Sequence, residues 1–430
     1  SARTTTQTPK TREPKGATRK PKAASRKPQA AANDTRAESR NRSLQDARRA
    51  RQDEFYTQYI DIQKEVEAYL ELNSDTFRDK IVYCNCDDPF ESNFFKYFAA
   101  NFNKLGLKRL ITTSYDGSPI ASAQLPLIEY TAGNGKRQKP KAIAVILDHV
   151  KDEDGDGAAN IDDVKLFLKR NKAARKALKD DGEYSGGDFR SAECVALLKE
   201  ADIVVTNPPF SLFRDYVAQL VEHGKKFLII GNVQAITYAE IFPLIKADKL
   251  WMGVTIHSGD REFRVPDHYP LNAAGWRIDE NGVKYIRVKG VRWWTNIDHG
   301  RRHEKLPLMT MDDNLKFSKH KEIKGKAAYD RYDNYDAIEV PFSDAIPSDY
   351  DGAMGVPITF LDKYNPEQFE ILGITDRGNV WGLKTKEYTR EDVQNANDLN
   401  RRAAIKVGKT YKPTYARLLI RRRTTKGKKK

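Results

Sequence analysis

The sequence predicts an α/β fold followed by a mixed, β-rich C-terminal region. Between about residues 80 and 250, short apolar runs rich in β-branched side chains alternate with segments of helical periodicity. After about residue 250, tryptophan and tyrosine become frequent, turns come closer together and helical periodicity weakens. Because parallel strands need helical crossovers between them, the first pattern predicts a Rossmann-like sheet covered by helices.

The alternating segment divides into elements in a regular order. It is preceded by an amphipathic helix that begins near Asp53 and continues to Leu70. The expected strands lie at 81–86, 107–113, 142–147, 202–206 and 227–230. The expected helices lie at 92–105, 160–180 and 211–223. We expect these strands to form one parallel sheet with right-handed crossovers.

The positive charge of the chain lies in its two ends. Residues 1–52 hold 15 Lys/Arg against 4 Asp/Glu, and residues 417–430 hold eight basic residues and no acidic one. Of the net charge of +15, these ends carry +11 and +8, which leaves −4 for residues 53–416. A polyanionic partner is therefore indicated mainly by the ends, and any nucleic-acid binding by the folded body depends on local patches.

Composition also sets the expected domain limits. Residues 1–45 contain one aliphatic side chain larger than alanine, Leu44, so they are expected to form a disordered basic tail. The Rossmann-like domain should span 46–250 and the β-rich region 251–420, with a second basic tail at 421–430. No apolar run approaches the roughly 18 residues of a membrane span, and three cysteines make no disulfide framework. These features predict a cytoplasmic protein without a membrane partner.

One tetrapeptide carries a clear chemical logic. Asn207, Pro208, Pro209 and Phe210 follow the apolar run 203–205, and proline ends a strand because it cannot donate to the ladder. Open α/β sheets bind their ligands beyond the carboxyl ends of such strands. The Asn207 side chain and the Pro208 carbonyl can accept both hydrogens of a planar amine while Phe210 stacks on its ring. The tetrapeptide is therefore the candidate catalytic site for methyl transfer to an exocyclic nitrogen.

Several planar amines fit this chemistry. They include adenine N6 and cytosine N4 in DNA, amino groups of RNA bases and the side-chain amide of protein glutamine. A protein of another class, an inactive DNA-binding relative, should have lost Asn207 or the tandem prolines, which are present. A plain loop is the structural alternative, but the apolar strand before the tetrapeptide and the amphipathic helix after it favour a site.

Longer blocks around the tetrapeptide resemble the EcoRI-type family of adenine-N6 DNA methyltransferases. The resemblance rests on Asn207–Arg214 and covers roughly residues 50–420. The other matching blocks are Asp53–Gln58, Val82–Pro89, Ser92–Phe98, Leu110–Thr113, Gly187–Phe189, Trp294–Asp298 and Gly355–Glu370. The resemblance implies a class-I methyltransferase domain with S-adenosyl-L-methionine as cofactor and a C-terminal target-recognition region. It also implies double-stranded DNA as partner, with the target adenine flipped out of the stack, and a cognate restriction endonuclease that is not physically bound.

The resemblance further implies how the first strand ends at the cofactor. Cys86, Asp87, Asp88 and Pro89 stand where class-I methyltransferases usually carry a glycine-rich loop, which this chain lacks. An acidic pair at this position can bind the ammonium group of the methyl donor. The alternative role for these acids is to stabilise the positive end of the following helix.

Two other segments resemble cofactor-binding positions of the family. Asp188 would accept the amino group of the donor's adenine, and Phe189 would stack on that ring. Phe55, Tyr56 and Thr57 would close over the donor from the N-terminal side, although Phe55 would serve equally well as a core residue of its helix.

The strongest local nucleic-acid signal is the segment Lys284–Lys305. It holds seven Lys/Arg against two acidic residues, with two adjacent tryptophans among them. Basic residues interleaved with aromatics suit phosphate neutralisation and base stacking. The candidate DNA-binding residues are Arg292, Trp293, Trp294, Arg301 and Arg302. The alternative interpretation is a strand whose tryptophans lie in the core.

A short acidic loop mimics a calcium site. Asp152, Asp154, Asp156 and Asp163 fall at positions 1, 3, 5 and 12 of a calcium-binding loop. Position 12 is Asp rather than Glu and position 8 is Ala159. We therefore expect a solvated acidic loop and no metal site.

Overall fold

The computed structural model describes residues 56–85, 92–115, 130–131, 137–138, 142–257, 260–265, 267, 271, 275–376 and 381–423. All of them belong to the unit that spans Ser43–Lys430. Several predictions lie outside the described residues: the basic tail at 1–45, most of the tail at 421–430, and the site residues Phe55, Cys86, Asp87, Asp88 and Pro89.

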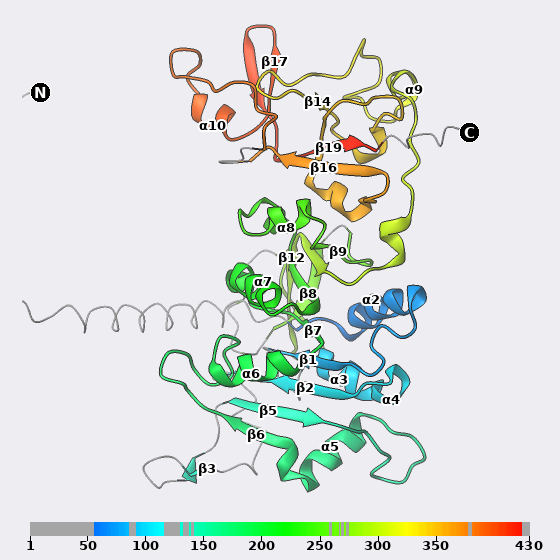
Figure 1. The fold of residues 1–430 in the computed structure, drawn as a ribbon, viewed down its shortest axis with the longest axis vertical. Coiled ribbons are helices and arrows are strands. Elements are labelled where there is room, and N and C mark those ends of the chain that lie inside the picture. The colour runs from blue at the N-terminus through cyan, green and yellow to red at the C-terminus, as the bar shows by residue number, and fades with distance from the viewer. Residues whose placement is uncertain are drawn as a thin grey trace, which may run out of the picture. The chain divides into compact units, whose positions relative to one another are not determined.

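An eight-stranded sheet carries the predicted catalytic tetrapeptide (Figure 1). In spatial order its strands are β6 (Arg175–Leu178), β5 (Ala142–Leu147), β2 (Arg109–Thr113), β1 (Ile81–Cys84), β7 (Ile203–Thr206), β8 (Lys226–Asn232), β13 (Val291–Thr295) and β9 (Trp251–Met252). The four strands β2, β1, β7 and β8 pair in parallel. The outer four strands pair antiparallel with their neighbours. The expectation of an all-parallel sheet is therefore wrong outside its centre.

Each face of the sheet has its own apolar core, because successive strand residues point to opposite sides. On one face pack α2 (Tyr59–Leu72), α3 (Asn93–Ala100), α4 (Phe102–Leu105) and α5 (Ile161–Arg170). On the other face pack α6 (Ala192–Glu200), α7 (Phe213–Glu222) and α8 (Phe242–Lys246). Helices on both faces bury the central strands, which accounts for their unbroken β-branched and apolar sequences.

One of the predicted helices ends earlier than expected, and another is interrupted. The helix predicted at 160–180 stops at Arg170, and the chain continues through a 3₁₀ turn, η1 (Lys172–Ala174), into the edge strand β6. The helix predicted at 92–105 breaks at Asn101 into α3 and α4, and α4 ends at Gly106 in the left-handed conformation with φ 65°. Periodicity alone misses both breaks, because a short, basic edge strand and a one-turn helix carry little apolar pattern.

The β-rich region predicted after residue 250 contains several smaller sheets. One orders β14 (Ile338–Glu339), β15 (Met354–Pro357), β19 (Arg417–Arg422) and β16 (Phe369–Ile374). A second orders β10 (Asp260–Arg264), β12 (Lys284–Lys289) and β11 (Arg277–Ile278). This region also holds the pair β17 (Ala404–Val407) with β18 (Thr410–Pro413) and the helices α9 (Met311–Phe317) and α10 (Ala396–Asn400). A further pair, β3 (Tyr130–Thr131) with β4 (Arg137–Gln138), lies earlier in the chain, between β2 and β5.

The domain limit expected at residue 250 does not coincide with the edge of the large sheet. Strands β9 and β13 come from the predicted second region, yet they extend the sheet beyond β8. The limit was drawn from composition, and composition does not register which strand hydrogen-bonds to which. In the ranges given above, no helix combines the length and the apolar character that a bilayer span requires.

A buried carboxylate fixes α2 against the chain that follows β9. Glu65 accepts hydrogen bonds from the backbone N–H groups of Val254 (2.7 Å) and Thr255 (2.8 Å) and from the Thr255 hydroxyl (2.6 Å). Burial raises the pKa of Glu65, and the three donors oppose that rise. The contact holds in place the helix that follows the predicted donor-closing segment at Tyr56–Thr57.

Candidate functional site

Buried polar side chains join the carboxyl ends of three adjacent strands, β2, β1 and β7. The Thr206 hydroxyl donates to the Asn85 carbonyl. The Thr113 hydroxyl donates to Asn85 Oδ1 over 2.8 Å, and the Tyr83 hydroxyl lies 3.1 Å from Thr113 Oγ1. All four residues are buried, so their mutual hydrogen bonds replace water and fix this edge of the sheet.

The predicted catalytic tetrapeptide leaves the sheet at this edge. Strand β7 is fully buried, half-buried Asn207 follows it directly, and Pro208 and Pro209 are buried. The chain turns through a 3₁₀ helix, η2 (Phe210–Leu212), into α7, whose apolar side is buried. Phe210 is half-buried and packs against the apolar core on the face of the sheet that α2 to α5 cover. Asn207 is thus held between an anchored strand and an anchored helix, beyond the carboxyl end of a central parallel strand, where such sheets bind ligands.

A glycine brings the predicted adenine-binding loop to the same edge. Gly187 has φ +81°, and a Cβ there would lie 2.0 Å from the Ser114 carbonyl oxygen and 2.6 Å from Tyr115 Cα. Only glycine allows this backbone conformation and this approach. The loop Gly187–Phe189 therefore packs directly on the chain that leaves β2, which keeps Asp188 near the strand ends.

Arg190 engages both residues that were predicted to bind the donor's adenine. Its guanidinium donates to both carboxylate oxygens of Asp188, over 3.0 and 2.8 Å. The same group lies 5.2 Å from the centre of the Phe189 ring. Phe189 is 2% exposed and packs edge-on against Tyr216 with ring centres 4.9 Å apart. In this structure Phe189 is a core residue and not an open stacking surface, which corrects the sequence prediction.

The N-terminal segment predicted to close over the donor meets the start of α3. Asn93 Nδ2 donates to the Thr57 carbonyl over 2.8 Å, and the Tyr56 N–H donates to the Arg264 carbonyl over 2.9 Å. Thr57 is buried, and its hydroxyl has no hydrogen-bond partner among the described residues. A buried hydroxyl without a partner is unfavourable, so this position suits a polar ligand group.

The two tryptophans predicted to contact DNA lie in the core. They are adjacent in β13 and are 1% and 0% exposed. The Trp293 ring packs edge-on against Phe94 at 6.1 Å, and the Trp294 ring packs against Phe213 at 5.5 Å on the opposite face of the sheet. Their prediction as base-stacking residues is wrong, because an inner strand covered on both faces presents no ring to solvent. The alternative interpretation, tryptophans in the core, is the one observed.

Arg292 and Arg301 are also held within the protein. Arg292 is buried and makes a two-pronged ion pair with Asp362, over 2.8 and 3.0 Å. Half-buried Arg301 donates to the carbonyls of Asp362 (3.1 Å) and Val254 (3.3 Å). Arg292 connects β13 to the segment around Asp362, and Arg301 connects that segment to the chain that follows β9. Their prediction as DNA-binding residues is not supported, because their donors are engaged by protein acceptors.

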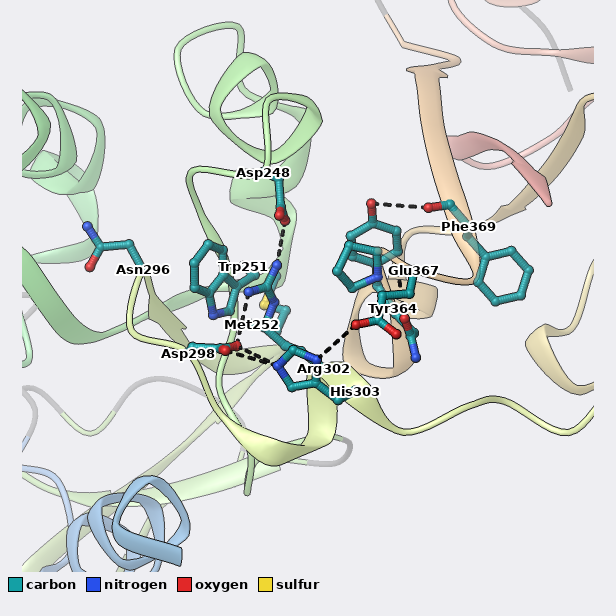
Figure 2. Close-up of polar contacts among 12 residues, drawn as sticks. Asp248, Trp251, Met252, Asn296, Asp298, Arg302, His303, Tyr364, Glu367 and Phe369 are labelled. Atoms are coloured by element: carbon teal, nitrogen blue, oxygen red, sulfur yellow. Dashed lines mark hydrogen bonds and ion pairs between the residues drawn. The ribbon is translucent and has the colours of Figure 1, made fainter. Parts of the chain in front are cut away.

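Arg302 is the centre of a structural cluster, as Figure 2 shows. Its guanidinium lies 3.6 Å from the centre of the Trp251 ring and pairs with Asp248 at 2.5 Å and Asp298 at 3.2 Å. His303 also contacts Asp298, over 2.9 Å. With only 9% of its side chain exposed, Arg302 stabilises the end of the sheet, which corrects its assignment to DNA.

Because His299 is buried, we expect the free energy of unfolding to fall in mild acid. Its Nε2 donates to the Met252 carbonyl over 2.8 Å, and its ring packs against Tyr69. Burial, opposed by that hydrogen bond, lowers its pKa to about 4 from 6.5. The unfolded chain therefore takes up a proton as the pH falls through 6.5, while the folded protein stays neutral at this site until about pH 4. The free energy of unfolding should fall by about 3 kcal/mol across this window.

The measurement is urea unfolding of the parent and of His299→Gln between pH 7 and pH 4.5. Glutamine keeps a donor for Met252 and does not titrate, so the variant should lose less stability on acidification. His149→Gln, at an exposed histidine, is the matched control. Parallel pH profiles of the parent and His299→Gln would contradict the assignment.

The acidic loop predicted as a calcium mimic uses its last carboxylate as a helix cap. Oxygens of Asp152, Asp154 and Asp156 lie within 4.8 Å of one another, and all three residues are exposed. The Asp163 carboxylate accepts the Asn160 N–H over 2.7 Å at the start of α5, and such backbone bonds lower its pKa. Capping thus accounts for the residue at position 12 of the loop.

Sequence reasoning missed the polar network at the strand ends. Tyr83, Asn85, Thr113 and Thr206 close three apolar strands, and three of them are the last or next residue of their strand. One sequence signal could have predicted this network: polar residues recur at the ends of the apolar runs in the α/β pattern. Arg190 was missed as well, and its contacts with Asp188 carry no sequence pattern.

Comparison with known proteins gives consistent matches over most of the chain. Residues 43–423 match the family described as "Adenine-specific methyltransferase EcoRI". The chain is 45% identical over 328 residues to the Type II methyltransferase M.EcoRI of Escherichia coli, covering 75% of this chain and 86% of that protein. It is 32% identical over 362 residues to the Type II methyltransferase M.MpnI of Mycoplasma pneumoniae, covering 82% and 93%. A relative from Mycoplasma genitalium, M.MgeORF184P, is 32% identical over 84% of this chain and 96% of its own. No solved structure matches significantly.

Proposed function

This chain belongs to the family of adenine-specific EcoRI methyltransferases, and on that premise we propose that it methylates the N6 amine of adenine in double-stranded DNA. The observation that carries the proposal is the position of Asn207-Pro-Pro-Phe210 beyond the carboxyl end of β7. Adenine as target agrees with the family, and DNA agrees with the Type II names of the relatives. RNA bases, cytosine and protein glutamine are not favoured by these matches.

The tetrapeptide supplies acceptors and a stacking surface for the target base. The exocyclic amine of adenine is a weak nucleophile because its lone pair is delocalised into the ring. Asn207 Oδ1 and the Pro208 carbonyl are proposed to accept its two hydrogens and thereby favour a tetrahedral nitrogen, with the acceptors already in place before reaction. Phe210 is proposed to stack on the flipped base. The buried prolines and the Thr206–Asn85 hydrogen bond hold these groups rigid.

S-adenosyl-L-methionine is the proposed cofactor, and it supplies an electrophilic methyl group on a sulfonium. One observation fits a bound polar group: the buried Thr57 hydroxyl has no hydrogen-bond partner among the described residues. Asp188 is proposed to accept the adenine amino group of the cofactor, for which Arg190 must release at least one of its hydrogen bonds. Tyr56 and the acids Asp87 and Asp88 are proposed to complete this site.

The names of the relatives suggest the biological setting. Each is a Type II methyltransferase, so we propose that this chain protects DNA as the methylating member of a restriction-modification pair. The companion endonuclease would read the same site without binding this protein.

The test is transfer of label from radioactive S-adenosyl-L-methionine. Plasmid DNA is incubated with the protein, digested to nucleosides and separated. We expect the label in 6-methyladenine. Label in 4-methylcytosine, or label found only when RNA or a glutamine-containing protein is the substrate, would overturn the proposal.

A further inference from the structure

Strands β17 and β18 form a two-stranded ribbon in the C-terminal region (Figure 1). Four residue pairs join them, from Ala404 with Pro413 to Val407 with Thr410. The turn passes through Gly408 with φ +59°. A ribbon of this kind is one of the two elements that the major groove of duplex DNA admits, the other being a helix.

The base of the ribbon is fixed, so its position does not depend on a ligand. Buried Asn334 accepts the Ala404 N–H over 2.8 Å and donates to the carbonyls of Leu399 (3.2 Å) and Arg402 (2.9 Å). Ala404 packs with Tyr388 and α10 in a small apolar cluster. The ribbon is therefore ordered before it binds a ligand, and binding does not carry the entropic cost of ordering it.

The ribbon presents three lysines to solvent, of which Lys406 lies near Asp333 and the Tyr411 ring. Residues 401–423 contain nine Lys/Arg and no acidic residue, and four of these arginines pair with acids elsewhere in the chain: Arg402, Arg417, Arg421 and Arg422. Lys406, Lys409 and Lys412 are exposed, and no ion pair in the described part of the chain involves any of them. The lysines Lys316, Lys319 and Lys326, by contrast, are paired with Asp312, Asp344 and Asp330.

The three lysines occupy both faces of the ribbon and its turn. Lys412 lies opposite Ile405 on one face, whereas Lys406 lies opposite Tyr411 on the other, because directly paired residues share a face. Lys409 lies in the turn. A groove of duplex DNA has a phosphate chain on each side, so cations on both faces can neutralise both chains.

An exposed tyrosine extends this surface beyond the ribbon. Tyr415 is 85% exposed, an unusual state for a ring of this size. With Arg401 and Pro413 it lines a hollow of about 490 Å³, into which Asp398 contributes the single acid. A phenol ring beside a guanidinium suits contact with a sugar or base.

We propose that Arg401, Lys406, Lys409, Lys412 and Tyr415 form a surface that binds duplex DNA, with the ribbon lying in a groove. The inference rests on the proposed function, because duplex DNA is the polyanion which that function requires. The ribbon surface takes the place of the segment Lys284–Lys305 as the proposed DNA-binding element of the C-terminal region. The candidate side chains of that segment are buried or half-buried.

The test compares two triple variants of the full chain. Lys406, Lys409 and Lys412 are replaced by glutamine in one, and the exposed lysines Lys151, Lys169 and Lys199 are replaced in the other. Affinity for a fluorescent duplex amplified from the plasmid of the methylation test is measured from 50 to 200 mM salt. Because each lost phosphate contact lowers the salt slope by about 0.9, the ribbon variant should lose roughly 40-fold less affinity over this range than the parent. The control should follow the parent.

Tyr415→Ala keeps the test independent of any effect of the lysines on folding. This variant should weaken binding with an unchanged salt slope, since it removes no charge. The inference would be overturned if the ribbon variant had the same salt slope as the parent and Tyr415→Ala had the same affinity as the parent. That result would leave the proposed adenine methylation by the parent untouched. A parent protein that binds the duplex through this surface but forms no 6-methyladenine would overturn the proposed function alone.

Discussion

Replacing Asn207 with alanine should lower the rate of methyl transfer by at least about 100-fold, because it removes one of the two acceptors proposed for the target amine. The fold should persist, since Asn207 is half-buried and the strand end is held by Thr206 and Asn85. The measurement is single-turnover transfer of label to adenine, with cofactor binding followed separately by calorimetry.

Two further variants show what the Asn207 side chain does. Asn207→Asp keeps an acceptor oxygen and should retain more activity than Asn207→Ala. Asn171→Ala, at an exposed asparagine after α5, is the matched control and should leave the rate unchanged. Transfer by Asn207→Ala at the rate of the parent, with intact DNA binding, would contradict the role of this amide.

Removing the Arg292 side chain should lower the free energy of unfolding by about 3–5 kcal/mol, because it leaves Asp362 buried and unpaired. The two side chains are only 4% and 6% exposed, so water cannot replace the lost partner. Their ion pair connects β13 to the 3₁₀ helix η6 (Ile358–Lys363). Urea unfolding of Arg292→Met measures the loss.

The double variant separates this structural role from a role in DNA binding. Arg292→Met combined with Asp362→Leu removes both charges, so it should recover most of the stability that either single change loses. DNA affinity should recover in parallel. The opposite result would support a role of Arg292 in DNA binding. In that case Arg292→Met would keep the stability of the parent but bind DNA more weakly, and the double variant would not restore binding.

The sequence predicted the central strands and the position of the Asn207 tetrapeptide after β7 well, because these depend on local patterns. Apolar runs that end in prolines define β7 and Asn207 without any knowledge of distant contacts. Gly187 lies in a block that the sequence analysis had already named, Gly187–Phe189. The reason for a glycine there, the close approach to the Ser114 carbonyl, is visible only in the structure.

The predictions that failed depend on contacts distant in sequence. The basic, aromatic segment around Trp293 and Trp294 is compatible with tryptophans at the surface and with tryptophans in the core. Only the pairing of β13 with β8, about sixty residues earlier in the chain, decides the question. Arg302 likewise reads as a free cation until Asp248 and Trp251 are brought beside it. Pairing across long loops leaves no periodic trace in a single sequence.

The late arrival of β13 beside β8 has a consequence for synthesis of the chain. Until residues 291–295 emerge from the ribosome, β8 has an unpaired side with open N–H and C=O groups. The face that Trp294 covers, around Phe213, is then incompletely buried. Complete burial of this side of the sheet therefore waits for β13, and a nascent chain stalled before residue 291 exposes a strand edge that can template aggregation.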